Sequence, residues 1–241
     1  MDAAAKIVNS KTNLRPMLRL ALPVVIEQLM IMMVTWTDHY LTAQYLETPH
    51  LAAINLMAYV LWVLPSIFAA IGVGATALVS RFFGAGEYEK AKFVTNQAIT
   101  IALMLLTVIT TVAWMYPREL IDIMQLPPAA TDAGAQYFKI IIPVFPFAIM
   151  HMIGNACLRG AGDIMSGFIT MAIVNVINVG CSLGLVTGWG PFPEMGWEGI
   201  AIGTAIGYAI GGSIIMAYLI RGRFHLKLHF SKMKPNLKMI S

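Results

Sequence analysis

Charged residues are scarce in this sequence. Asp, Glu, Lys and Arg together make up only 12% of its 241 residues, against about 25% in a typical soluble domain. Hydrophobic residues make up 58%, and the mean hydropathy is +0.73. A chain with so little charge cannot cover a folded surface with groups that water solvates. The composition excludes an ordinary soluble domain and indicates an integral membrane protein.

The sequence also has few cysteines and lacks common enzyme motifs. The two cysteines, Cys157 and Cys181, lie in apolar segments without metal-ligand spacing, which predicts free thiols packed as small hydrophobic groups. The sequence has no Ser/His/Asp set, no HExxH motif and no paired intramembrane aspartates. We therefore expect neither an enzyme nor a cofactor. The basic residues flank apolar segments instead of forming a face with aromatic residues, which argues against a nucleic-acid partner.

Six apolar segments are each long enough to cross a bilayer, for which a helix needs about 20 residues. They cover residues 17–46, 52–79, 93–116, 136–158, 165–187 and 199–220. The first is too long for a signal peptide and lacks a cleavage pattern. We expect an all-α, polytopic bundle of six transmembrane helices over residues 17–220, after an N-terminal segment at 1–16 and before a basic tail at 221–241.

Basic residues are distributed unevenly between the two sides of these segments. Fourteen of the 16 Lys and Arg lie on one side, in the N-terminal segment and the first residues of the first span, the second and fourth loops and the tail, and only Arg118 and Lys139 lie on the other side. Positive loops stay in the cytoplasm. The pattern predicts a multi-pass plasma-membrane protein with both termini cytoplasmic. The alternating "FHLKLHF" of the tail fits a short strand, an interfacial segment or, as we prefer, a linker.

Two acids lie within the first segment. Glu27 and Asp38 are eleven residues apart, which places them within about 20° of one helix face and about 16 Å apart along the axis. A charged aspartate deep in a membrane costs about 2.5–3.5 kcal/mol or more. Such a residue indicates a function, although a carboxylate that only joins helices by hydrogen bonds remains an alternative.

Polar residues of the last two segments can meet Asp38. Asn175, Asn178 and Ser182 form one stripe on the fifth segment, and Thr204 and Tyr208 lie one turn apart on the sixth. Counted from the outer ends at about 1.5 Å per residue, Asp38, Asn178, Ser182 and Thr204 lie at similar depths. Their amide and hydroxyl oxygens suit Na⁺, and a proton would neutralise the acid equally well. We predict a cation-coupling site at these four residues.

Other polar or deformable residues have less specific patterns. Glu27 is expected either to face a water-filled cavity or to pair with a neighbouring group. Candidates for a substrate or cavity lining are Glu27, Asn175, Tyr208 and Met33. Methionine, however, is more often filler in an apolar bundle. His151 and Asn155, one turn apart, predict a second polar patch.

Five sequence motifs follow one another in a characteristic order and spacing. "LALPVVIEQL", "TDHYLTA", "IGVGATALVSRFFGAGEYEKA", "LRGAGD" and "GWEGIAIGTAIG" resemble the N-terminal lobe of the multidrug and toxic compound extrusion (MATE) family, from about residue 18 to 220. The resemblance implies a secondary exporter of organic cations and other drugs, driven by entry of H⁺ or Na⁺. It makes Asp38 the coupling acid, Asn178 and Thr204 its partners in a Na⁺ or proton site, and Pro23 the hinge of the first helix.

Three features depart from that family. Ser182 replaces an aspartate found in many members, which weakens a Na⁺ site and favours a proton at Asp38. His39 replaces a small polar residue. The sequence contains one six-helix lobe where the family has two, so we expect a second lobe as partner, either in a longer chain, which the linker-like tail favours, or in a homodimer. A lipid-linked carrier flippase and a non-transporting scaffold half are the alternatives, and the sequence does not predict the substrate.

Overall fold

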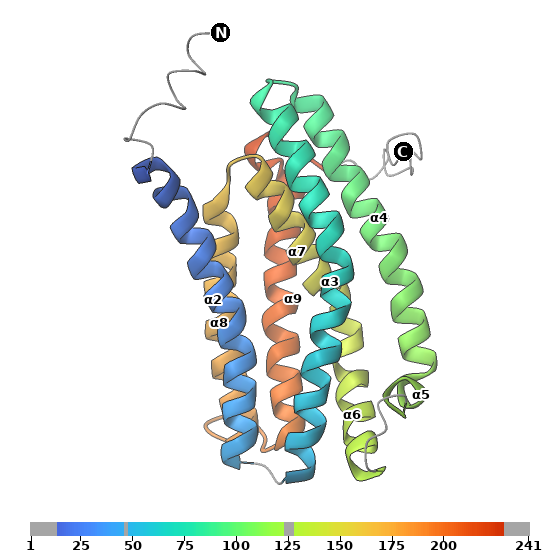
Figure 1. Ribbon diagram of the computed structural model, residues 1–241. Helices are drawn as coiled ribbons and strands as arrows, with labels where there is room; N and C mark the ends of the chain where they lie inside the picture. The colour runs from blue at the N-terminus through green and yellow to red at the C-terminus, as the bar shows by residue number, and fades with distance from the viewer. Residues whose placement is uncertain (1–13, 46–47, 123–127, 229–241) are drawn as a thin grey trace.

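The computed structural model describes residues 14–45, 48–122 and 128–228. Within these ranges the chain is helical and contains no strand. The elements, in chain order, are α2 (Leu14–Tyr45), α3 (Thr48–Gly84), α4 (Tyr88–Met115), α5 (Pro117–Asp122), α6 (Pro128–Ile141), η1 (Ile142–Val144), α7 (Phe145–Gly160), α8 (Ile164–Thr187), α9 (Trp197–Arg221) and η2 (Arg223–His225). The long helices run side by side as a bundle (Figure 1).

Six helical stretches of the described chain are long and apolar enough to cross a membrane. They are Ala21–Tyr45, Pro65–Gly84, Tyr88–Met115, Gly134–Gly160, Ile164–Thr187 and Trp197–Arg221. Each overlaps one of the six predicted segments, so the all-α, six-span architecture is confirmed. The short helix α5, between the third and fourth spans, was not predicted because its "PRELID" sequence is too short and too polar to give a membrane signal.

The fourth span is broken, whereas the first two continue through their prolines. Helix α6 ends at Ile141, a 3₁₀ turn follows, and α7 begins at Phe145, with Pro143 and Pro146 in the first residues of η1 and α7. Proline lacks the N–H that a continuous helix would use at these positions. By contrast, Pro23 lies inside α2 and Pro65 inside α3 without a break. The hinge role of Pro23 stays a prediction.

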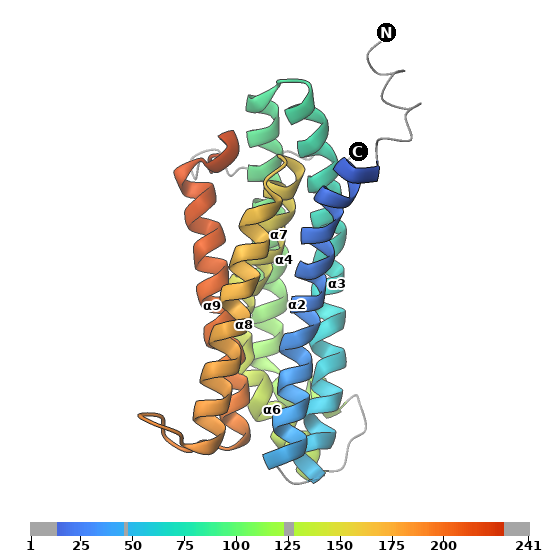
Figure 2. The same cartoon turned by 90° about the vertical axis from the view of Figure 1, so that its left-hand side faces the viewer.

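The bundle has two distinct ends. The start of α2, the α3–α4 turn, the α7–α8 turn and η2 lie at one end, at the top of Figures 1 and 2, which we call the basic end. The end of α2, helix α5 and the α8–α9 loop lie at the opposite end. The α7–α8 turn is held by Asp163, whose Oδ1 accepts a hydrogen bond from the Ser166 backbone N–H at 3.1 Å and so caps α8.

Helices α8 and α9 approach each other closely along the glycines of "GIAIGTAIGYAIGG". A Cβ added at Gly203 would lie 2.6 Å from the Ser182 backbone nitrogen, and one added at Gly199 would lie 2.8 Å from the Leu185 carbonyl carbon. Only glycine permits this backbone separation. The close contact places Ser182 and its neighbours directly against α9, where the site described below is formed.

The described part of the tail folds back onto the basic end. Gly222 ends α9 with φ of 78°, after which Leu226 and Leu228 are buried in the bundle core. The Leu228 N–H donates to the Leu219 carbonyl at 3.1 Å. Over residues 224–228 the alternation buries Leu226 and Leu228, leaves the three residues between and before them exposed, and forms no strand. The linker role of the tail stays a prediction. Residues 1–13 and 229–241 lie outside the described chain.

Candidate functional site

Three helices meet around Asp38. The Asp38 Oδ2 accepts a hydrogen bond from Thr204 Oγ1 of α9 at 2.8 Å, and Asp38 Oδ1 is 3.4 Å from Asn178 Nδ2 of α8. Asn178 Nδ2 also donates to Thr204 Oγ1 at 2.8 Å and is 3.4 Å from Ser182 Oγ. The four residues form what we call the Asp38 layer. The sequence-based depths predict that these four side chains share a level, and the structure brings them into contact.

The Asp38 layer is shielded from the surroundings of the bundle. Asn178 and Ser182 have no exposed surface, and Asp38 and Thr204 are 7% and 8% exposed. Both carboxyl oxygens of Asp38 have a donor, while its backbone carbonyl accepts from Thr42 Oγ1 at 2.6 Å. Within the described chain, Asn178 Oδ1 is buried without a hydrogen-bond partner. A buried amide oxygen without a donor is costly, and it is available to a small cation.

The chemistry of the Asp38 layer is limited to hard oxygen donors. It supplies one carboxylate, one amide oxygen and two hydroxyls, which suit a proton or Na⁺. The described residues contain no group of three or more His, Cys, Asp or Glu that could hold a metal ion. Proton binding needs only Asp38, whereas Na⁺ binding would require Asn178 to turn its oxygen toward the carboxylate.

A second buried acid lies nearer the basic end. Glu27 is 2% exposed, and its Oε1 accepts a hydrogen bond from Asn155 Nδ2 of α7 at 2.5 Å. Arg159 Nη1, one turn further along α7, is 4.0 Å from the same oxygen. Glu27 Oε2 and Asn155 Oδ1 have no hydrogen-bond partner in the described chain. We call Glu27, Asn155 and Arg159 the Glu27 layer. Glu27 is thus paired with a neighbouring side chain, and its predicted role in a substrate or cavity lining stays a prediction.

Three further polar side chains belong to neither layer. His151 of α7 is 5% exposed, and its ring centroid is 6.5 Å from that of Tyr208 of α9 in an edge-on arrangement. Asn175 donates to the Met171 carbonyl of its own helix at 2.9 Å instead of joining Asp38. His151 Nε2 and Asn175 Oδ1 are buried without partners in the described chain. The cavity-lining roles predicted for Asn175 and Tyr208 stay predictions.

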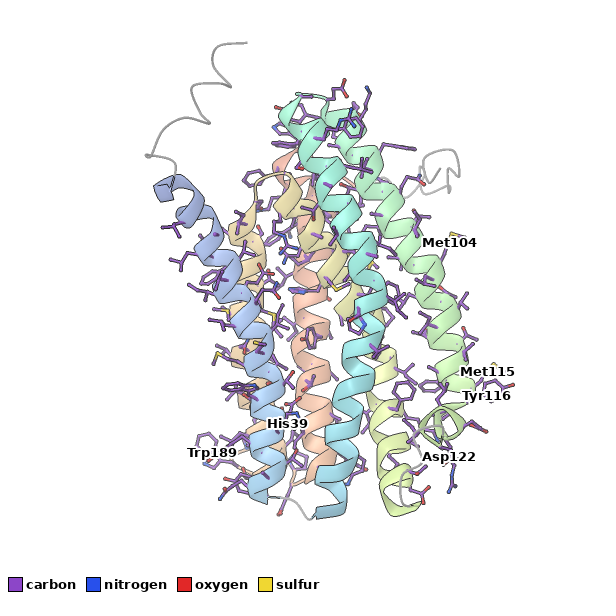
Figure 3. The ribbon with its side chains drawn as sticks, viewed as in Figure 1. His39, Met104, Met115, Tyr116, Asp122 and Trp189 are labelled. Carbon is purple, nitrogen blue, oxygen red and sulfur yellow. The ribbon has the colours of Figure 1, made fainter. Side chains whose placement is uncertain are left out.

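Met33 and His39 lie away from the two layers. Met33 is 54% exposed on a face of α2 that also exposes Met32 and Trp36. A substrate could therefore reach Met33 only from outside this lobe, and its lining role stays a prediction. His39 is half-buried and lies in the part of α2 nearer the opposite end (Figure 3), where Trp189 is also exposed.

The sequence did not reveal the partners of Glu27. Arg159 entered only the count of basic loop residues, and Asn155 was grouped with His151. A depth count like the one used for Asp38 does not find them. Glu27 lies 13 residues after the start of α2 (27 minus 14), whereas Asn155 lies only 5 residues before the end of α7 (160 minus 155). Counting from the helix ends therefore does not place this acid and this amide at one level.

The chain is similar to known transport proteins over most of its length. It is 28% identical to "Probable multidrug resistance protein YoeA" of Bacillus subtilis over 81% of this chain and 42% of that protein. It is 26% identical to "Probable multidrug resistance protein NorM" of Thermotoga maritima over 92% of this chain and 47% of that protein. A "FAD transporter" of Shewanella oneidensis is 26% identical over 83% and 44%. The chain spans about half the length of these curated relatives.

Solved structures show the same fold. A crystal structure of "MATE in the bent conformation" matches with a TM-score of 0.83 at 20% identity, over 92% of this chain and 49% of that one. An inward-facing MATE transporter matches with a TM-score of 0.77, over 86% and 46%. The model of the MatE family matches residues 23–183, which include both acids of α2, all of α7 and most of α8. The chain therefore belongs to the MATE family.

Proposed function

We propose that this chain is the N-terminal lobe of a secondary active multidrug exporter, with Asp38 as the acid that couples drug export to entry of H⁺ or Na⁺. The names of the YoeA and NorM relatives support drug export. The half-length coverage supports a second lobe, supplied by a longer chain or by a homodimer mate. The observation that carries the coupling role is the burial of Asp38 against Thr204 and Asn178.

Neutralisation of Asp38 would change the contacts between helices. As a carboxylate, Asp38 accepts from donors on α8 and α9. Once protonated, one of its oxygens becomes a donor and can no longer accept a hydrogen bond in the same way. A bound cation would instead be coordinated by the oxygens of Asp38 and Thr204, and would compete with the hydrogen bond between them. Either event weakens the attachment of α2 to α8 and α9, and a bend at Pro23 would let α2 move.

A preference of one conformation for the cation is what would drive transport. A ligand shifts a conformational equilibrium only by its difference in affinity for the two states. In this proposal the cation enters from outside, binds the Asp38 layer and stabilises the state that releases drug outward. The basic end then faces the cytoplasm, as the fourteen basic residues on that side predict. The bilayer, organic cations and the second lobe are the proposed partners.

Transport by reconstituted protein tests this function. Vesicles containing the chain, alone and together with a candidate second lobe, are loaded with a fluorescent lipophilic cation under an imposed pH or Na⁺ gradient. Asp38→Asn is expected to abolish gradient-driven transport. The matched control is Asp132→Asn, which removes an exposed acid paired with Arg118 at the opposite end and is expected to leave transport unchanged. Equal transport by wild type and Asp38→Asn would contradict the proposal.

The relative named as an FAD transporter supports a second candidate substrate class. An anionic dinucleotide would need cationic groups in the cavity, and Arg159, which lies 4.0 Å from the buried acid Glu27, is one such group. Inhibition of drug transport by excess FAD would favour that class, whereas inhibition only by organic cations would favour drug export.

A further inference from the structure

We propose that Glu27 is a second proton-binding site of this lobe, connected to the Asp38 layer by the polar side chains between them. The proposal rests on the proposed function in one respect, since it takes Asp38 to be the first proton site. It starts from the Glu27 layer, in which a fully buried carboxyl group has a donor on one oxygen and none on the other.

The partners of Glu27 favour a proton over a metal cation. Asn155 turns its amide nitrogen toward Glu27, and the Arg159 guanidinium lies 4.0 Å away. Both groups present positive charge to the carboxyl group, so Na⁺ would be repelled from that side. The Asn155 side chain also lies close to Gly167 of α8, where an added Cβ would meet it. A proton needs no coordination shell and can occupy the free oxygen, Oε2.

The Arg159 contact is too long to neutralise Glu27 fully. At 4.0 Å it lies at the outer limit of an ion pair, and the Arg159 side chain is 30% exposed while that of Glu27 is 3% exposed. A buried carboxylate that lacks a close cation and a full set of donors is unfavourable. Glu27 can therefore exist in two forms, as a carboxylate held by Asn155 with Arg159 nearby, or as a neutral acid that no longer attracts Arg159.

The charged and titratable groups around Glu27 are few. On α7 they are Arg159 and His151, and on α9 Tyr208. At the start of α8, Asp163 is bonded to Arg223 at 2.7 Å. The half of α3 toward the basic end carries only Arg81, which is exposed. Arg159 is thus the one charged group of the described chain recorded in contact with Glu27.

Matching spacings connect the two layers. Glu27 and Asp38 are eleven residues apart on α2, and so are Gly167 and Asn178, their neighbours in the two layers on α8. Between the layers, Tyr208 lies one turn from Thr204 on α9 and His151 lies one turn from Asn155 on α7. The His151 and Tyr208 rings are 6.5 Å apart. Polar side chains therefore continue from the Asp38 layer to the Glu27 layer over about 16 Å.

The proton balance is simple. A hydronium ion from water at the basic end transfers its proton to Glu27 Oε2, giving a neutral carboxylic acid and a water molecule, and the reverse step releases the proton to the same side. Arg159 stays protonated throughout because guanidinium does not titrate in proteins. Its partly exposed side chain marks the side from which water reaches the acid.

Carboxyl NMR of the 241-residue chain in lipid nanodiscs tests the proposal and requires no transport. Protein labelled with ¹³C at the glutamate carboxyl is titrated from about pH 5 to about pH 8, the range in which a physiological proton site must respond. The Glu27 resonance is the one absent from Glu27→Gln and present in Glu194→Gln, an exposed loop control. We expect it to titrate, and to do so at a different pH in Arg159→Gln.

The Arg159→Gln variant keeps the test decisive even if Glu27→Gln does not fold. If Glu27→Gln is not recovered, the glutamate resonance that responds to Arg159→Gln identifies Glu27 in a chain that retains the acid. A Glu27 resonance that stays constant across the range, in both wild type and Arg159→Gln, would overturn the proposal. Protein labelled at aspartate instead reports Asp38 separately, so failure at Glu27 and failure of the coupling role of Asp38 are distinguishable.

Discussion

Asp38 and Glu27 lie on one face of α2, yet their carboxyl groups have different surroundings. Each oxygen of Asp38 has a neutral donor, from Thr204 and from Asn178, and no cationic group is recorded in contact with it in the described chain. Glu27 has one neutral donor, a distant guanidinium and one oxygen without a partner. In the Asp38 layer the backbones of α8 and α9 lie in close contact, whereas in the Glu27 layer the helices are connected through side chains. Two acids with similar burial on one helix face therefore lie in layers that differ in how easily their contacts can change.

The largest effect is expected from breaking the packing under the Asp38 layer. In Gly203→Ala the added carbon would lie 2.6 Å from the Ser182 backbone nitrogen and 2.8 Å from its Cα, so α8 and α9 must separate. We expect the free energy of unfolding in mixed micelles to fall by about 1–3 kcal/mol. The control is Gly180→Ala, which meets nothing within 4 Å and should stabilise the helix by roughly 0.5–1 kcal/mol. Equal stability of the two variants would contradict the close approach.

A smaller loss is expected from removing the hydroxyl that joins Asp38 to Asn178. Thr204→Val removes the donor to Asp38 Oδ2 and the acceptor for Asn178 Nδ2. We expect a loss of about 0.6–1.7 kcal/mol, the range measured for hydrogen bonds between membrane helices. Thr107→Val is the matched control, because the Thr107 hydroxyl is bonded only to the Leu103 carbonyl of its own helix and is exposed. A loss no larger than that of the control would show that the layer adds no stability.

A substitution that disturbs the Glu27 layer should lower the free energy of unfolding by less than one that disturbs the Asp38 layer. In Gly167→Ala the three nearest atoms to the added carbon all belong to the Asn155 side chain, with Nδ2 at 2.6 Å. A side chain can rotate where a backbone cannot, so we expect only the Asn155–Glu27 hydrogen bond to be lost, at a cost of about 0.6 kcal/mol. The same unfolding measurement applies. A cost as large as that of Gly203→Ala would mean that the two layers are equally rigid.

The smallest effect sets the baseline for both layers. The ion pair between Arg118 and Asp132 has an N–O distance of 3.2 Å, but both side chains are about 60% exposed at the opposite end. Exposed pairs contribute little because water and salt screen them. We expect Asp132→Asn to change the free energy of unfolding by less than about 0.5 kcal/mol. A larger loss would show that α5 and α6 depend on this contact.

The sequence predicted the membrane fold well because the signals for it are local. Twenty or so apolar residues identify each span. The break in the fourth span was not predicted, because proline interrupts the helix at residues 143–146 but not at Pro23 or Pro65. The Asp38 layer was also accessible, because Asp38, Asn178 and Thr204 lie at countable depths from neighbouring loops. Their role in coupling remains a prediction.

The Glu27 layer could not be assigned because it depends on how α2 crosses α7. A count along the chain does not place Glu27 and Asn155 at the same depth, and it does not say which helix faces Glu27. That choice depends on tertiary details such as Gly167, whose missing side chain makes room for Asn155. The packing of Leu226 and Leu228 against the bundle core was not predicted for a similar reason. The alternating pattern of the tail indicates which of its side chains are buried, but it does not indicate which helices they contact.

The glycines of α9 determine which helices of the lobe can move relative to one another. Added carbons at Gly199, Gly203, Gly207 and Gly211 would all meet atoms of α8, so neither helix can slide along the other without a collision. Helix α2 has far less of its surface covered, with 17% of its apolar window buried against 50% for α8 and for α9. We therefore expect α8 and α9 to move as one unit. The separation of two probes placed on this pair should stay constant, while their separations from a third probe on α2 would report the motion of α2.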